Sequence, residues 1–135
     1  PVSAHFGAAH GEANAVLLPY VIAYNAQKPS KFTIFPKYDK FVADKRYAQI
    51  SRYLGLGGKT QEEQIANLIA AIRSLMKELN VPMSIRECGV DEETFLKALP
   101  GLSERAFEDQ CTTANPRYPL VSELEEIYRK AYYGE

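Results

Sequence analysis

Two histidines near the amino end of this 135-residue chain, His5 and His10, could bind a borderline metal such as zinc or ferrous iron. On one continuous helix, a spacing of five residues would point their imidazoles about 140° apart, so the pair does not make a site by itself. Because such a metal takes three or four protein ligands, a site at His10 must take the others from residues outside this chain. Considered alone, His10 is more readily interpreted as a hydrogen-bonded structural residue.

The residues that follow His10 strengthen the metal-ligand interpretation. Gly11 allows another group to approach closely, and Asn14, one helical turn further along, could supply a hydrogen bond on the same side. Residues 15–24 are then too apolar for a surface helix. The longest uncharged run, 13–27, contains a proline and is shorter than the roughly 18 to 20 residues that a membrane-spanning helix requires. The sequence therefore predicts a buried helix that begins with a potential metal ligand.

The two cysteines, Cys88 and Cys111, indicate the redox compartment of the protein more clearly than a catalytic role. Two thiols are too few for a disulfide framework and form no Cys-x-x-Cys pair, which is typical of the reducing cytoplasm. Cys111 could be a nucleophile, but we expect it to close a helix, where the carbonyls of the carboxyl end disfavour a thiolate. A packing or pocket-lining role is favoured. Residues 111–117 form either a tight loop whose Asn and Arg hydrogen-bond inward or an ordinary helix-ending turn.

One segment imitates a nucleotide-binding motif. Residues 55–60 end in the Gly-Lys-Thr of a phosphate-binding loop, but Tyr53 stands where that loop needs a glycine, and the segment follows a predicted helix rather than a strand. We interpret it as a helix stop joined to the cap of the next helix. Acidic clusters at 91–93 and 108–109 are interpreted as complements of helix dipoles rather than catalytic pairs.

Apolar residues recur at three- and four-residue steps in most of the chain, which predicts helices. One helix spans 41–54 and stops at Gly55. Thr60 and Glu63 form a capping box that begins another, and residues 80–82 end it with an asparagine and a proline.

Three further helices are predicted from their capping residues. They follow Asp91, Ser103 and the pair Ser122 and Glu125. Residues 31–38 alone read as extended, and prolines around them indicate a connecting segment. Because no repeat or linker divides the chain, we expect one all-α domain over residues 1–135, a bundle of about six helices.

Charge and length exclude several partners. Sixteen basic residues against 17 acidic ones, with a pI near 6.2, leave no positive field to attract nucleic acid or an acidic membrane surface. A domain of this size can bury a sufficient core without a disulfide or a structural metal. The chain begins at Pro1 rather than a methionine, and we expect it to be a piece of a longer protein.

Residues 10–21 resemble the His-Gly-x-Ala-Asn-Ala-x-Leu-Leu-Pro stretch of the iron-dependent alcohol dehydrogenases. Residues 107–124 are similar to the end of the alcohol dehydrogenase half of bifunctional aldehyde-alcohol dehydrogenases, and residues 38–48 and 53–56 fit the same group. The likeness covers essentially the whole chain. Ala9, where many members have proline, and Ser3, where glycine is common, depart from the pattern.

The resemblance implies a two-domain enzyme with an amino-terminal α/β domain for the nicotinamide cofactor and a carboxy-terminal helical domain. This chain would be the later part of the helical domain of that dehydroquinate synthase-like fold, without the cofactor domain. The family binds divalent iron through one Asp and three His, and the last histidine falls on His10, with the other three ligands upstream. Zinc is the alternative metal. By the same match Cys111 lies near the substrate pocket, and no residue of this chain is assigned a catalytic role.

The resemblance also implies an activity. We expect a fragment of an NAD-linked enzyme that interconverts a primary alcohol and an aldehyde by hydride transfer and that is inactive alone. Its partners would be a small alcohol or aldehyde, the missing amino-terminal domain and, in a homo-oligomer, copies of itself. The alternative is a helical interaction or oligomerisation module with no metal site, in which His10 is merely structural.

Overall fold

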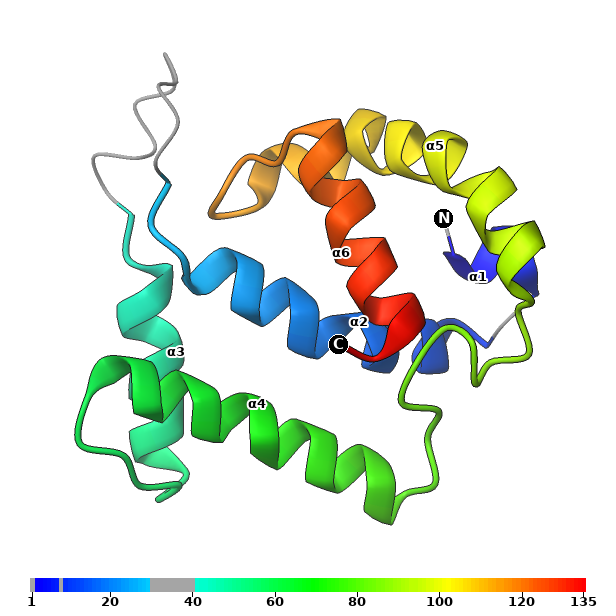
Figure 1. Ribbon diagram of the computed structural model, residues 1–135. Helices are drawn as coiled ribbons and strands as arrows, with labels where there is room; N and C mark the ends of the chain where they lie inside the picture. The colour runs from blue at the N-terminus through cyan, green and yellow to red at the C-terminus, as the bar shows by residue number, and fades with distance from the viewer. Residues whose placement is uncertain (1, 8, 30–40) are drawn as a thin grey trace.

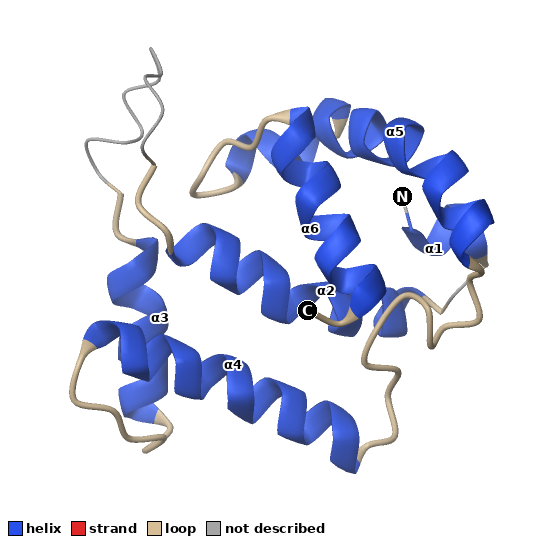
Figure 2. Cartoon of the chain, viewed as in Figure 1, coloured by secondary structure: helices blue, strands red, loops and turns tan. Residues whose placement is uncertain are grey.

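The computed structural model describes residues 2–7, 9–29 and 41–135, and these are helical throughout their regular parts (Figure 1). Figure 2 shows no strand among them, so the predicted all-α bundle of about six helices is confirmed. The extended segment predicted at 31–38 lies outside the described residues. The elements are α1 (Val2–Phe6), α2 (His10–Ala26), α3 (Ala43–Tyr53), α4 (Gln61–Glu78), α5 (Glu92–Glu108), the 3₁₀-helix η2 (Gln110–Ala114) and α6 (Val121–Tyr133).

Helix α2 is the centre of the bundle. It is apolar around its whole circumference, and α1, α3, α4 and α6 all pack against it. Figure 1 shows α2 running between α4 on one side and α6 on the other, with α3 paired to α4 and α5 paired to α6. Among the described residues, no helix combines the length and apolarity needed to cross a membrane. The predicted buried helix behind His10 is therefore confirmed as the element on which the others are assembled.

The main core lies between α2, α5 and α6. The rings of Phe95 and Tyr132 stack with centroids 4.2 Å apart and planes inclined by 10°. The Tyr132 hydroxyl donates to the Val90 carbonyl at 3.0 Å, which satisfies the polar end of a buried aromatic side chain. Other members of this core include Val16, Leu99, Leu102 and Ala131.

The predicted break before Ser103 is wrong. Asp91 does cap a helix, since its carboxylate accepts from the Thr94 amide at 3.0 Å, but α5 then continues without interruption past Pro100 and Ser103. Pro100 lies on the exposed side of α5, where the carbonyl that loses its partner can bond to water, while the adjacent Leu99 is turned into the core and buried. Tertiary packing of the apolar side therefore outweighs the local helix-breaking signal.

The capping box predicted at Ser122 and Glu125 is also wrong, by a shift of two residues. Helix α6 begins at Val121, and the Glu123 carboxylate accepts from the Leu120 amide at 2.7 Å. By contrast, the Thr60 box is confirmed: the Glu63 amide donates to the Thr60 hydroxyl at 3.2 Å, and Glu63 accepts from the Thr60 amide.

The glycine-rich segment at 55–60 joins α3 to α4 and is confirmed as a helix stop followed by a cap. Gly58 has φ +103°, and a β-carbon there would lie 2.9 Å from the Gln64 amide nitrogen. We expect Gly58→Ala to destabilise the chain by about 2 to 4 kcal/mol, through backbone strain and a clash with the first turn of α4. Gly57→Ala is the control, because Gly57 shares a positive φ of +79° but has open space around it, and about 1 kcal/mol is expected. Urea unfolding measures both, and equal losses would contradict the close approach at Gly58.

Burial raises the pKa of Tyr128 in α6 to about 12. In the unfolded chain a tyrosine ionises near pH 10, so the contribution of the neutral phenol to stability is complete below about pH 10 and is lost as the pH rises to about 12. The difference between the pKa of Tyr128 in the folded chain and in the unfolded chain corresponds to about 2 to 3 kcal/mol of folding free energy. Urea unfolding measures the free energy of unfolding at pH 9 and at pH 11. The decrease between these two pH values should be smaller for Tyr128→Phe than for the unchanged chain. Tyr53→Phe removes an exposed phenol, and it should leave the loss unchanged.

Candidate metal and substrate site

The two histidines lie on different helices. Gly7, with φ +70°, separates α1 from α2. His5 and His10 therefore do not share one continuous helix, and the angle of about 140° expected between their imidazoles on such a helix does not apply. His5 is in α1, where its Nδ1 lies 3.5 Å from an Nη of Arg105 and its ring meets Phe6 edge to face. His10 is the first residue of α2 and is exposed. The two imidazoles therefore lie in different surroundings.

His10 lines a cavity of about 530 Å³ that extends along one side of α2. The cavity also receives Asn14, Val21 and Tyr24, at steps of four, seven and three residues that keep all four side chains on one stripe of the helix. The opposite wall comes from the end of α5, from η2 and from the start of α6. Its residues are Ala106, Asp109, Cys111, Thr112, Asn115, Pro119, Leu124 and Ile127.

The structure thus places His10 and Cys111 around one cavity, which we call the His10–Cys111 cavity. Asn14, which the sequence had suggested as a hydrogen-bonding neighbour, also lines it. Val21 and Tyr24 were not predicted as lining residues, although their helical spacing from His10 places them on the same side of the helix. Apart from Cys111, which the family resemblance placed near the substrate pocket, the residues of this second wall were not predicted from the sequence.

Cys111 is an exposed residue of η2, and the neighbouring carboxylate controls its thiol. Asp109 accepts a hydrogen bond from the Cys111 amide at 2.8 Å, and its hydrogen bonding and negative charge raise the pKa of the thiol. The prediction that Cys111 closes a helix is wrong, because α5 ends at Glu108 and Cys111 is the second residue of η2. The Asp109 carboxylate, rather than the carbonyls of a helix end, therefore disfavours the thiolate. A protonated thiol is a poor nucleophile, which agrees with a pocket-lining role.

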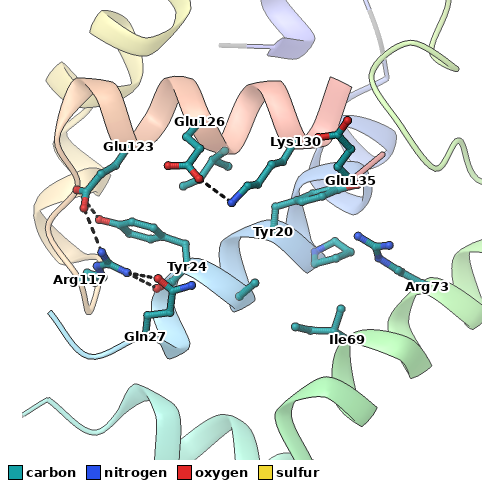
Figure 3. Close-up of a pocket in the computed structure, with 13 residues that line it drawn as sticks. Tyr20, Tyr24, Gln27, Ile69, Arg73, Arg117, Glu123, Glu126, Lys130 and Glu135 are labelled. Atoms are coloured by element: carbon teal, nitrogen blue, oxygen red, sulfur yellow. Dashed lines mark hydrogen bonds and ion pairs between the residues drawn. The ribbon is translucent and has the colours of Figure 1, made fainter. Parts of the chain in front are cut away.

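Residues 111–117 combine parts of both interpretations left open by the sequence: η2 continues to Ala114, and the loop that follows it turns the Asn115 and Arg117 side chains inward to hydrogen-bond with α2. The side-chain amides of Asn115 and Asn25 donate to each other at 2.8 and 3.0 Å. Arg117 is buried, and its guanidinium reaches α2 and α6 (Figure 3). This loop is therefore fixed to the far end of the helix that begins at His10.

His10 can supply one metal ligand. Its exposed imidazole on the cavity wall fits a borderline divalent metal in donor type and access. Within residues 2–7, 9–29 and 41–135, no three His, Cys, Asp or Glu side chains gather in a group that could hold an ion. The remaining ligands of a site at His10 would have to come from other residues.

Comparison with known proteins gives a consistent family. The model of the carboxy-terminal part of the Fe-containing alcohol dehydrogenase family matches residues 1–132. The bifunctional aldehyde-alcohol dehydrogenase of Escherichia coli is 48% identical, covering 98% of this chain and 15% of that protein. The NADPH-dependent butanol dehydrogenase of Clostridium saccharobutylicum is 37% identical, covering 93% of this chain and 29% of that protein. A solved structure, the iron-containing alcohol dehydrogenase of Thermococcus thioreducens, superposes with a TM-score of 0.77 at 37% identity, covering 98% of this chain and 30% of that one.

The chain spans about 15% of the bifunctional relative and 29 to 30% of the other two proteins. The match covers the described helices and the residues around the His10–Cys111 cavity alike. Fold, sequence and family model agree. The chain belongs to the iron-containing alcohol dehydrogenase family, of which it matches the carboxy-terminal part.

Proposed function

We propose that this chain is the carboxy-terminal metal-binding domain, over residues 1–135, of an iron-dependent, NAD-linked alcohol dehydrogenase. The parent protein interconverts a small primary alcohol and its aldehyde, and the isolated chain, which lacks the α/β cofactor domain, is inactive. The observation that carries the proposal is that His10 and Cys111 line one cavity. The resemblance had assigned them, from opposite ends of the chain, to the metal and to the substrate pocket.

Each wall of the cavity has a role in this proposal. His10 binds divalent iron as a neutral imidazole, and the other three ligands lie upstream. Iron, when bound, supplies Lewis acidity that stabilises negative charge on an alcohol oxygen, and the nicotinamide supplies the hydride acceptor. Val21, Leu124 and Ile127 provide apolar surface that excludes bulk water from the cavity. Cys111, kept protonated by Asp109, lines the substrate space without competing as a nucleophile.

Two refinements rest on the relatives. Iron is favoured over zinc, because the family and the Thermococcus thioreducens enzyme are both described as iron-containing. NAD is proposed over NADP from the resemblance to the bifunctional enzymes, although the Clostridium saccharobutylicum relative is named as NADPH-dependent. We further propose a cytoplasmic protein that forms homo-oligomers.

The experiment uses the parent protein with its upstream residues, purified without oxygen in the presence of ferrous iron. We expect about one iron per chain by elemental analysis, and NADH formation from ethanol by absorbance. The 135-residue chain alone should retain no stoichiometric iron and produce no NADH. A pure parent protein that holds no metal and oxidises no alcohol would contradict the proposal.

The same metal analysis tests the alternative function, an interaction module without a metal. One observation favours a contact surface: α3 exposes Ile50 and Tyr53, with 46% and 90% of their areas accessible, beside Val42 at its start. This surface is compatible with homo-oligomerisation of the enzyme. The module without a metal requires in addition that the parent protein binds no iron.

A further inference from the structure

Arg117 joins the loop after η2 to the last turn of α2. Its side chain is buried, with 8% of the residue's area accessible. One Nη donates to the Tyr24 carbonyl at 3.0 Å and to Gln27 Oε1 at 3.1 Å, as Figure 3 shows. The guanidinium also lies over the Tyr24 ring, 4.0 Å from its centroid. A cation is favourable at this position, because the carbonyls at the carboxyl end of a helix lack intrahelical partners.

The other Nη of Arg117 reaches α6. It forms an ion pair with Glu123 Oε1 at 3.1 Å, and the two side chains are only 10% and 20% accessible. The second oxygen of Glu123 accepts from the Tyr24 hydroxyl at 2.9 Å (Figure 3) and from the Leu120 amide at 2.7 Å. Both Nη groups of Arg117 and both oxygens of Glu123 are hydrogen-bonded, whereas the buried Arg117 Nε has no partner among the described residues. Because the pair is largely shielded and makes these several hydrogen bonds, its geometry is fixed more firmly than that of a surface ion pair.

Asn25 and Asn115 form the second connection. Their amides exchange two hydrogen bonds, and Asn25 is 3% accessible, so the pair is shielded from competing water. Asn115 also donates to the Arg117 carbonyl, which couples this pair to the guanidinium contacts. We call the five residues Tyr24, Asn25, Asn115, Arg117 and Glu123 the loop clamp.

The loop clamp is part of the cavity as well as of the fold. Tyr24 and Asn115 both line the His10–Cys111 cavity, and Cys111 is separated from Asn115 by three residues of η2. His10 and Tyr24 are carried by the same rigid helix, about 21 Å apart along its axis. The clamp therefore ties the wall that bears Cys111 to the helix that bears His10.

We propose that Arg117 is a positioning residue: through the loop clamp it holds the Cys111 wall at a fixed distance from His10, and so sets the shape of the substrate space. The expected effect on alcohol oxidation rests on the proposed function. The claim that Arg117 fixes the position of the Cys111 wall does not depend on it. A purely structural arginine would stabilise the fold without controlling the exposure of Cys111 or the binding of an alcohol.

The test uses Arg117→Met in the iron-loaded parent protein. Cys111 is exposed in this chain, but in the proposed parent protein it lines a substrate space that the upstream domain would cover. We therefore expect the rate of Cys111 alkylation by N-ethylmaleimide, followed by peptide mass spectrometry, to rise at least about tenfold, because loss of buried charged hydrogen bonds favours local opening of that covered wall. Alkylation of Cys88, half-buried in another loop, is the internal control and should not change. For ethanol, kcat/KM should fall about ten- to hundredfold with iron content unchanged, since a small misplacement of a wall impairs alignment.

Two further variants separate positioning from stability. Arg117→Lys keeps the charge but cannot make all of the guanidinium contacts at once, so we expect intermediate effects on Cys111 alkylation and on kcat/KM. It also keeps the test open if the methionine variant does not fold. Arg73→Met is the matched control, because Arg73 likewise lies over an aromatic ring of α2, 5.2 Å from the centroid of Tyr20, but is not a member of the clamp. It should leave Cys111 alkylation and kcat/KM near the parent values.

Unchanged Cys111 alkylation in the Arg117 variants, with only a lower melting temperature, would overturn the inference. Equal increases at Cys111 and Cys88 would overturn it too, because they would indicate general loosening. If the parent protein binds no iron and oxidises no alcohol, the proposed function fails, yet faster alkylation confined to Cys111 would still support the clamp. The two failures are therefore distinguishable.

Discussion

Replacing His10 by alanine in the parent protein is expected to remove the bound iron and to reduce alcohol oxidation by more than about a hundredfold. Changes in residues that only orient a metal ligand already lower metal affinity or activity by 10- to 100-fold, and His10 is proposed as a ligand itself. Its imidazole would be one of four protein ligands, and no other His, Cys, Asp or Glu cluster among the described residues could replace it. An incomplete set of ligands binds iron weakly and positions the alcohol oxygen poorly.

The measurement pairs iron content with the rate of NADH formation from ethanol. His5→Ala is the control, since His5 is also an exposed histidine of the amino-terminal segment but contacts Arg105 and Phe6. We expect it to keep both iron and activity. His10 is itself exposed at the start of α2, so its replacement should leave the circular dichroism spectrum of the protein unchanged. Iron content and activity within twofold of the parent in His10→Ala would contradict the assignment.

Those helix ends that depend on short-range chemistry were predicted correctly from the sequence. The Thr60 hydroxyl and the Glu63 carboxylate complete each other's hydrogen bonds within a single turn, and no distant residue is needed. Gly55, with φ +68°, ends α3 for an equally local reason. The apolar composition of residues 15–24 likewise predicted a buried helix, because a helix without a polar side must be covered on most sides.

Predictions failed where distant residues decide the local structure. Ser103 reads as a helix cap, but packing of Leu99 and Leu102 in the core carries α5 past Pro100. Ser122, followed three residues later by Glu125, also has the local pattern of a capping box, but α6 begins earlier. The actual start of α6 depends on Glu123, whose carboxylate is held by Arg117 and Tyr24 from other elements, and the sequence contains no local sign of this contact.

The candidate site divides in the same way. His10 and Asn14 could be placed on one side of a helix from their spacing, and Cys111 could be expected near a pocket from the family resemblance. Their meeting in one cavity depends on how α2 packs against α6, and α6 against α5, which helical periodicity alone does not specify. The role of Asp109 in keeping Cys111 protonated could have been read from its position two residues earlier, but only once the turn between them was known.

Phe95→Ala is expected to be the most destabilising of the substitutions considered for the isolated chain, by about 3 to 5 kcal/mol. Phe95 is 0% accessible and stacks on Tyr132, which is 1% accessible. Removing the ring eliminates that stacking and leaves a cavity between α5 and α6 that neighbouring side chains can fill only partly. Because domains are stable by only about 5 to 15 kcal/mol, this loss is a large share of the total.

Leu96→Ala is the matched control, since Leu96 is the next residue of α5, is also apolar, and is 39% accessible. Truncating a half-exposed side chain removes less buried surface and leaves no enclosed cavity, so about 1 kcal/mol or less is expected. Urea unfolding followed by circular dichroism compares the two, and Phe95→Leu provides a folded intermediate if Phe95→Ala does not fold. Similar losses for Phe95→Ala and Leu96→Ala would show that the stacked pair is not central to the core. A loss confined to Phe95 would instead establish that contacts between α5 and α6 hold together the two helices that frame the cavity wall opposite His10.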